Sequence, residues 1–110
     1  MIYVIYRTAS GKQISEMQEA LGGYIKTAVD VRRGILAGGG ALHADCEQAL
    51  LRDGSEQTDI WGADWNPLTN EVTFEALINI RPRQGNRSMS IQDTQLQTRV
   101  EKIMRELLRR

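Results

Sequence analysis

Residues 58–81 read TDIWGADW-NPLTNE-VTFEALINIR, and this stretch predicts a β-hairpin. Its two arms, 58–65 and 72–81, are rich in aromatic and β-branched residues, which favour strands. The joint between them contains Pro67, which cannot donate a hydrogen bond to a strand partner and therefore belongs in a turn. We expect this hairpin to supply two strands of a half-buried antiparallel sheet.

The second arm of the hairpin sorts its side chains by polarity. Alternate residues of a strand point to opposite faces, and one face of this arm is apolar. Its members are Val72, Phe74, Ala76, Ile78 and Ile80. Glu75, Asn79 and Arg81 should therefore project together from the other face. We also expect at least one arginine of segment 81–87 to pair with an acid of segment 59–75.

The chain before the hairpin predicts three strands and two helices. Residues 1–6 read as a buried strand, and apolar residues at helical spacing predict a short helix over 14–21. The alternating segment 24–31 and the apolar segment 35–37 predict a second hairpin. Helical spacing over 42–50 predicts another short helix, which ends at a turn-forming Asp-Gly-Ser sequence.

Three consecutive glycines, Gly38-Gly39-Gly40, precede the second helix and are expected to interrupt regular structure. Glycines ahead of a helix can present backbone N–H groups to an anion. This run lacks the Lys-Ser/Thr ending of a P-loop, so we favour a connector or a β-bulge over an anion site.

The last helix, expected from Asp93 to about Leu108, has the clearest amphipathic pattern in the chain. The sequence Ser90-Ile91-Gln92-Asp93 has the form of a capping box before it. Its apolar positions form a stripe. They are Leu96, Val100, Ile103, Met104, Leu107 and Leu108. This stripe must be covered, either by the sheet of its own chain or by a second copy of the protein.

These elements predict an α+β fold in two layers, with a mostly antiparallel sheet and about three helices in the order β-α-β-β-α-β-β-α. The first six elements suggest a ferredoxin-like unit, extended by one strand and the closing helix. A length of 110 residues fits a single domain, 1–110, and 41% hydrophobic residues fit a globular core.

The composition also limits where the protein works. Cys46 is the only cysteine, so an intrachain disulfide is excluded. The apolar N-terminus is too short for a signal peptide, and no apolar run is long enough to cross a membrane. We therefore expect a cytoplasmic protein with no membrane partner.

Four segments resemble a known family: GILAGGG at 34–40, LHADCE at 42–47, DIWGADW at 59–65 and INIRP at 78–82. From about residue 24 to residue 93, the chain resembles short bacterial proteins, well represented in cyanobacteria, that are catalogued as a domain of unknown function. That family brings no activity, cofactor or site residue. The resemblance implies only that the chain is a complete stand-alone protein.

A polar, arginine-rich loop is the first candidate binding site. Acidic residues concentrate between residues 30 and 75, whereas basic residues concentrate after residue 75. Around the loop, several side chains could donate hydrogen bonds to a phosphate or carboxylate. They are Asn79, Arg81, Arg83, Asn86 and Arg87. The alternative is that these arginines pair with Asp59, Asp64 and Glu75 and hold the loop in place.

The densest cluster of reactive side chains consists of His43, Asp45, Cys46 and Glu47, and three of these, His43, Cys46 and Glu47, have helical spacing. At i, i+3 and i+4 on a helix they would share one face, and a thiol beside an imidazole can act as a nucleophile. His43 and Glu47 would give only two metal ligands, so we predict no metal site and no cofactor. Cys46 lies in register with apolar neighbours, so we expect it to be buried and slow towards thiol reagents.

Three functions therefore compete. The favoured one is a small binding or accessory protein that meets an anionic ligand or protein partner near 81–87. The alternatives are a small enzyme built on His43 and Cys46, and an oligomeric interaction protein that uses the closing helix. Nucleic-acid binding is not favoured, because Trp61 and Trp65 are expected in the core and no basic strand lies beside them.

Overall fold

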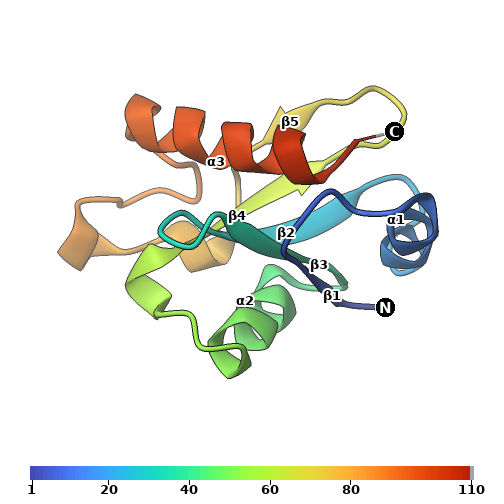
Figure 1. The fold of residues 1–110 in the computed structure, drawn as a ribbon. Helices are drawn as coiled ribbons and strands as arrows, with labels where there is room; N and C mark the ends of the chain where they lie inside the picture. Colours follow the sequence, from blue (N-terminus) through green and yellow to red (C-terminus); the bar gives the residue numbers. More distant parts are fainter. Residues whose placement is uncertain (110) are drawn as a thin grey trace.

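The structure of the chain is a computed structural model that describes residues 1–109. Eight helices and strands follow one another along it (Figure 1). They are β1 (Tyr3–Ile5), α1 (Gly11–Gln18), β2 (Ile25–Asp30), β3 (Ile35–Gly40), α2 (His43–Arg52), β4 (Ile60–Trp65), β5 (Val72–Thr73) and α3 (Thr94–Leu107). Short 3-10 helices lie at Gln57–Asp59, Leu77–Asn79 and Pro82–Gln84. The α+β class and the predicted element order are confirmed.

The five strands form one antiparallel sheet in the order β1-β3-β2-β4-β5. In a ferredoxin-like unit the first strand lies inside the sheet. Here β1 is an edge strand next to β3, and β4 pairs with β2. The ferredoxin-like topology predicted from the element order is therefore wrong, because the order of elements along a chain does not determine which strands become neighbours.

Helices cover both faces of the sheet, where the sequence had suggested two layers. In Figure 1, α3 lies above the sheet and α2 lies below it. The residues that α3 covers include Val29, Trp61 and Trp65, whereas Ala28 and Ile60 belong to the cluster that also contains Leu50 of α2. Neighbouring residues of the central strands are thus buried on opposite faces, and both tryptophans lie in the core as expected.

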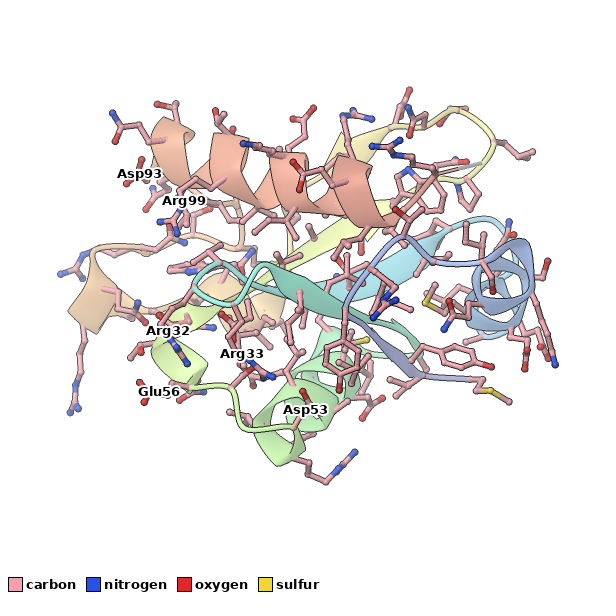
Figure 2. All side chains as sticks on the ribbon, in the orientation of Figure 1. Arg32, Arg33, Asp53, Glu56, Asp93 and Arg99 are labelled. Atoms are coloured by element: carbon pink, nitrogen blue, oxygen red, sulfur yellow. The ribbon has the colours of Figure 1, made fainter. Side chains whose placement is uncertain are left out.

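The hairpin of β2 and β3 is confirmed, and its turn is tied to the end of α2. The carboxylate of Asp30 accepts hydrogen bonds at 2.9 Å from the backbone N–H groups of Arg32 and Arg33. The guanidinium of Arg33 then lies 2.9 Å from the carboxylate of Asp53 (Figure 2). The turn closes at Gly34, where φ is 68°.

The triple glycine does not interrupt regular structure, because it is the end of β3 and is buried. The register with β2 shifts between Lys26 and Thr27, which face Gly40 and Gly38, and this leaves Gly39 as the bulged residue. Gly39 has φ of 101°, and a Cβ there would lie 2.1 Å from the carbonyl oxygen of Met1. The bulge interpretation is confirmed, and the packing against the N-terminus explains why glycine is required.

The predicted strand over 72–81 is wrong beyond Thr73, and side-chain hydrogen bonds explain the difference. Asn79 is fully buried, and its side chain bonds both backbone groups of Gly62 in β4. These bonds favour a 3-10 turn over a continued strand. Asn79 therefore faces the sheet while Glu75 is exposed, so the expectation that Glu75, Asn79 and Arg81 share one face is also wrong.

The closing helix packs on its own sheet. Four residues of the predicted stripe are buried, namely Val100, Met104, Leu107 and Leu108, while Leu96 and Ile103 are partly buried. Asp93, rather than Ser90, caps the helix by accepting bonds from the N–H groups of Gln95 and Leu96. The stripe is thus not free to bind a second copy. No helix in the described part of the chain is long and apolar enough to cross a membrane.

Candidate functional site

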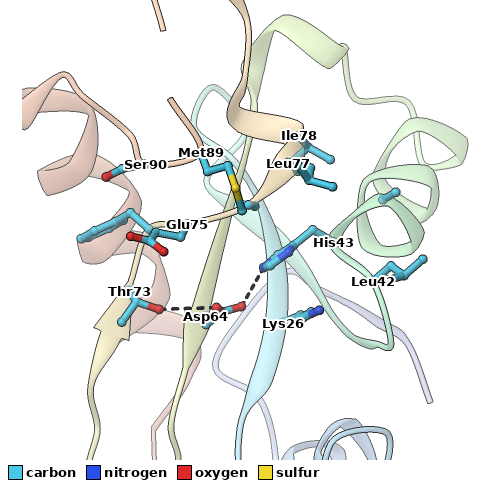
Figure 3. A pocket seen from close by; sticks show the side chains of 13 residues that line it. Lys26, Leu42, His43, Asp64, Thr73, Glu75, Leu77, Ile78, Met89 and Ser90 are labelled. Atoms are coloured by element: carbon cyan, nitrogen blue, oxygen red, sulfur yellow. Dashed lines mark hydrogen bonds and ion pairs between the residues drawn. The ribbon is translucent and has the colours of Figure 1, made fainter. Parts of the chain in front are cut away.

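A cavity of about 630 Å³ opens between the start of α2, the strands β4 and β5, and the segments 74–78 and 89–90 (Figure 3). Its lining is largely apolar, and the polar side chains within it come from different elements. The apolar lining includes Leu42, Phe74, Leu77, Ile78 and Met89. The polar lining consists of Lys26, His43, Asp64, Thr73, Glu75 and Ser90.

The centre of the polar lining is a hydrogen-bonded pair of side chains that joins α2 to the sheet. Nε2 of His43 lies 2.7 Å from Oδ1 of Asp64, and the hydroxyl of Thr73 donates to Oδ2 of Asp64 at 3.4 Å. The side chains of His43 and Asp64 are 11% and 21% exposed. A neutral imidazole that donates from Nε2 to Asp64 keeps a lone pair on Nδ1. That nitrogen can accept a hydrogen bond from a ligand.

Strand alternation accounts for the position of Asp64. In β4, Trp61 and Ala63 face the α3 side of the core, so Asp64 faces the α2 side. Its neighbours across the sheet are Lys26 on β2 and Thr73 on β5. His43 is the first residue of α2, which begins three residues after β3 ends.

A glycine of β4 lets the far wall of the cavity pack closely on the sheet. A Cβ at Gly62 would lie 2.5 Å from Cβ of Ala76 and 3.0 Å from Cγ1 of Ile78, both of which line the cavity. The absence of a side chain at Gly62 therefore allows segment 76–78 to lie directly on the strand.

Two asparagines hold that wall in place. The side chain of Asn79 accepts from the N–H of Gly62 at 2.7 Å and donates to the carbonyls of Gly62, Phe74 and Met89 at 3.0, 3.2 and 3.1 Å. The amide of Asn86, which is also buried, donates to the carbonyl of Asn79 at 2.8 Å. Both residues were predicted to bind a ligand, and here their polar groups bond the protein backbone.

Arg81 is likewise engaged within the protein. Its guanidinium donates to the carbonyls of Gln57 at 2.6 Å and of Ile60, and it lies 4.6 Å from the ring centroid of Trp61. One of its nitrogens is 3.5 Å from the buried carboxylate of Glu47. Burial lowers the pKa of Arg81, although the Glu47 carboxylate opposes this shift.

The prediction that an arginine of the loop returns to the 59–75 hairpin is wrong. Within residues 1–109, neither Arg81 nor Arg83 nor Arg87 forms an ion pair with an acid of that hairpin. Arg81 instead reaches Glu47 on α2, so Glu47 is not available to form a site with His43. Arg83 and Arg87 are exposed, and their role in binding a ligand stays a prediction.

The structure does not bring His43 and Cys46 together as a catalytic pair. The thiol of Cys46 is fully buried and donates to the carbonyl of Lys26 at 3.4 Å, whereas the imidazole bonds Asp64. Burial raises the pKa of Cys46 from 9.0 to about 11, which suppresses the nucleophilic thiolate. The predicted burial is confirmed. In the described residues no three His, Cys, Asp or Glu side chains converge as metal ligands.

Sequence reasoning did not predict that His43 and Thr73 both bond the carboxylate of Asp64. The alternation of β4 was visible in the sequence, and it places Asp64 opposite the tryptophan face. The missing information was that α2 covers that same face of the sheet. A helix that precedes a strand can pack on either face, and local spacing does not decide between them.

Comparisons with known proteins add a family but no activity. No curated protein and no solved structure matches the chain. A family model matches residues 3–107, a wider region than the segment from about 24 to 93 over which the sequence motifs indicated a resemblance. The chain belongs to the family described as Protein of unknown function (DUF5674).

Proposed function

We propose that this protein binds a small organic molecule in the cavity between α2 and the β4–β5 edge of the sheet. The observation that carries the proposal is the convergence of His43, Asp64 and Thr73, from three separate elements, in a largely apolar cavity of about 630 Å³. Ligand sites typically combine apolar walls with a few placed polar groups, in volumes of roughly 300–1,000 Å³.

The mouth of the cavity supports the same proposal. Leu42, Leu77 and Met89 line it and are 57%, 72% and 42% exposed. One exposed apolar side chain is ordinary, but three around a single opening form a surface that an apolar ligand would cover. The His43–Asp64 pair then supplies hydrogen bonds that orient the polar end of the ligand.

A cavity-filling variant tests this function. Ala44 lines the cavity and is exposed, so Ala44→Trp should fill the site without disturbing the core. Gln48→Trp, on an exposed position of the same helix that does not line the cavity, is the matched control. A fragment library screened by ligand-observed NMR should give hits for the wild-type protein and the control that Ala44→Trp abolishes. Hits that persist in Ala44→Trp would contradict the proposal.

A second candidate is the anion site predicted for the arginine loop. Of the five residues predicted for this site, Arg83 and Arg87 are still candidates. Both are exposed and form no side-chain ion pair within the described residues. Guanidinium groups of this kind can bind phosphate or carboxylate. Phosphate-induced NMR shifts at this loop that disappear in the double variant Arg83→Gln/Arg87→Gln would support it. Shifts unchanged by that variant would refute it.

A further inference from the structure

A second hollow lies beside the cavity along the same edge of the sheet. The second hollow measures about 320 Å³ and is lined by Tyr24, Trp65 and Glu71, among others. Asp64 and Thr73 line both hollows, so the two meet at this pair of residues. An elongated ligand could therefore occupy both hollows and pass over Asp64.

The charges along this path are mostly negative. Glu75 lines the first hollow, Glu71 lines the second, and Asp64 lines both, so the three acids are distributed along the path. The opposing charge is Lys26, whose ammonium already donates to the carbonyl of Ala41 at 3.2 Å.

The carboxylates also have capacity for a further donor. One oxygen of Asp64 bonds His43, but the other receives only the long 3.4 Å bond from Thr73. No side-chain hydrogen bond occupies Glu71 or Glu75 in residues 1–109, and both are exposed. Apolar and aromatic walls lie beside these acids, including Phe74 in the first hollow. Such a surface suits ammonium groups joined by methylene chains.

We propose that the ligand of this site is an aliphatic polyamine that spans both hollows. This inference rests on the proposed function and specifies its ligand class. One ammonium group would lie near Asp64 and Glu75 in the first hollow, and another would lie near Glu71 in the second. The methylene chain would contact the apolar walls. A dicarboxylate of the same length would be repelled by the three acids.

Calorimetric titration with spermidine, 1-butylamine and adipate tests the ligand class. Spermidine should bind at least tenfold more tightly than 1-butylamine, and adipate should not bind. Glu71→Gln and Glu75→Gln should each weaken spermidine binding several-fold. Glu56→Gln, an exposed acid that lines neither hollow, should leave it unchanged. Because the three glutamates are exposed, these variants should fold, which circular dichroism would check.

The outcomes separate this inference from the proposed function. Equal binding of spermidine by all three variants, equal affinity for 1-butylamine, or preferential binding of adipate would overturn the polyamine assignment. If no amine binds but Ala44→Trp still abolishes fragment binding, the cavity is a ligand site for another class of molecule. If amines bind as predicted but Ala44→Trp leaves fragment binding unchanged, the amines act at the acidic edge alone and a ligand spanning both hollows is refuted.

Discussion

Asn79→Ala should be one of the most damaging single substitutions in the chain, although it removes only a small polar side chain. Asn79 is fully buried beneath the segment that forms the far wall of the cavity. Truncation removes the acceptor for the N–H of Gly62 and the amide donor for the carbonyls of Gly62, Phe74 and Met89. Three stretches of backbone lose their common bonding partner.

The two bonds to Gly62 set the magnitude of the effect, because both lie in the buried interior. An unsatisfied buried donor or acceptor costs roughly 1–3 kcal/mol, so the two Gly62 groups alone account for about 2–6 kcal/mol. The bonds to Phe74 and Met89 are partly buried and add less. We expect a loss of about 3–5 kcal/mol, a large share of the ~5–15 kcal/mol that stabilises a typical domain.

Urea denaturation followed by circular dichroism measures this loss. Asn66→Ala is the matched control, because the Asn66 side chain likewise bonds the backbone, accepting from the N–H groups of Leu68 and Thr69, but in an exposed turn. The control should lose only about 0.5–1.5 kcal/mol. If Asn79→Ala loses no more than Asn66→Ala, the wall is not held by this side chain and the reasoning is refuted.

Three further predictions concern other parts of the fold. Between pH 9 and pH 11 the unfolded chain releases the Cys46 proton that the folded protein keeps, so stability should fall by about 2 kcal/mol over that range. Cys46→Ala should remove this part of the pH dependence in urea titrations, and an unchanged slope would contradict it. Gly39→Ala should be far more destabilising than Gly54→Ala in thermal melts. The two glycines have φ of 101° and 102°, but only the added Cβ at Gly39 meets other atoms, so equal losses would refute the packing argument. In α3, Met104→Asp should unfold the protein, whereas Ile103→Asp should lose less because Ile103 is only partly buried, and a chain truncated before α3 should not melt cooperatively. A soluble truncated chain with a cooperative melt would show that α3 is not integral to the core.

The sequence correctly predicted those elements that are determined by the periodicity of their own side chains. The hairpin of β2 and β3, the stripe of α3 and the burial of Trp61 follow from side-chain periodicity, which the structure preserves. The same periodicity wrongly predicted a strand for residues 74–81, because Asn79 and Arg81 occupy alternate positions as strand residues do. Their side chains bond backbone groups of segments far along the chain, and these bonds favour short turns over a ladder.

The candidate site was harder to predict than the fold because its contacts are between distant segments. His43 and Asp64 are 21 residues apart, and Arg81 reaches Glu47 across a still longer separation. Each pair depends on which face of the sheet α2 covers. The charge segregation along the chain suggested ion pairs near the arginine loop, but a buried arginine can be satisfied by backbone carbonyls, as Arg81 largely is.

The most direct test of the central claim is a two-dimensional 1H–15N NMR titration with a fragment that binds the protein. We predict that the backbone signals that shift will cluster around the cavity, at His43, Ala44, Asp64, Thr73 and Met89. Shifts that cluster instead at Arg83 and Arg87, or that form no group on the surface, would contradict a ligand site at the His43–Asp64 pair.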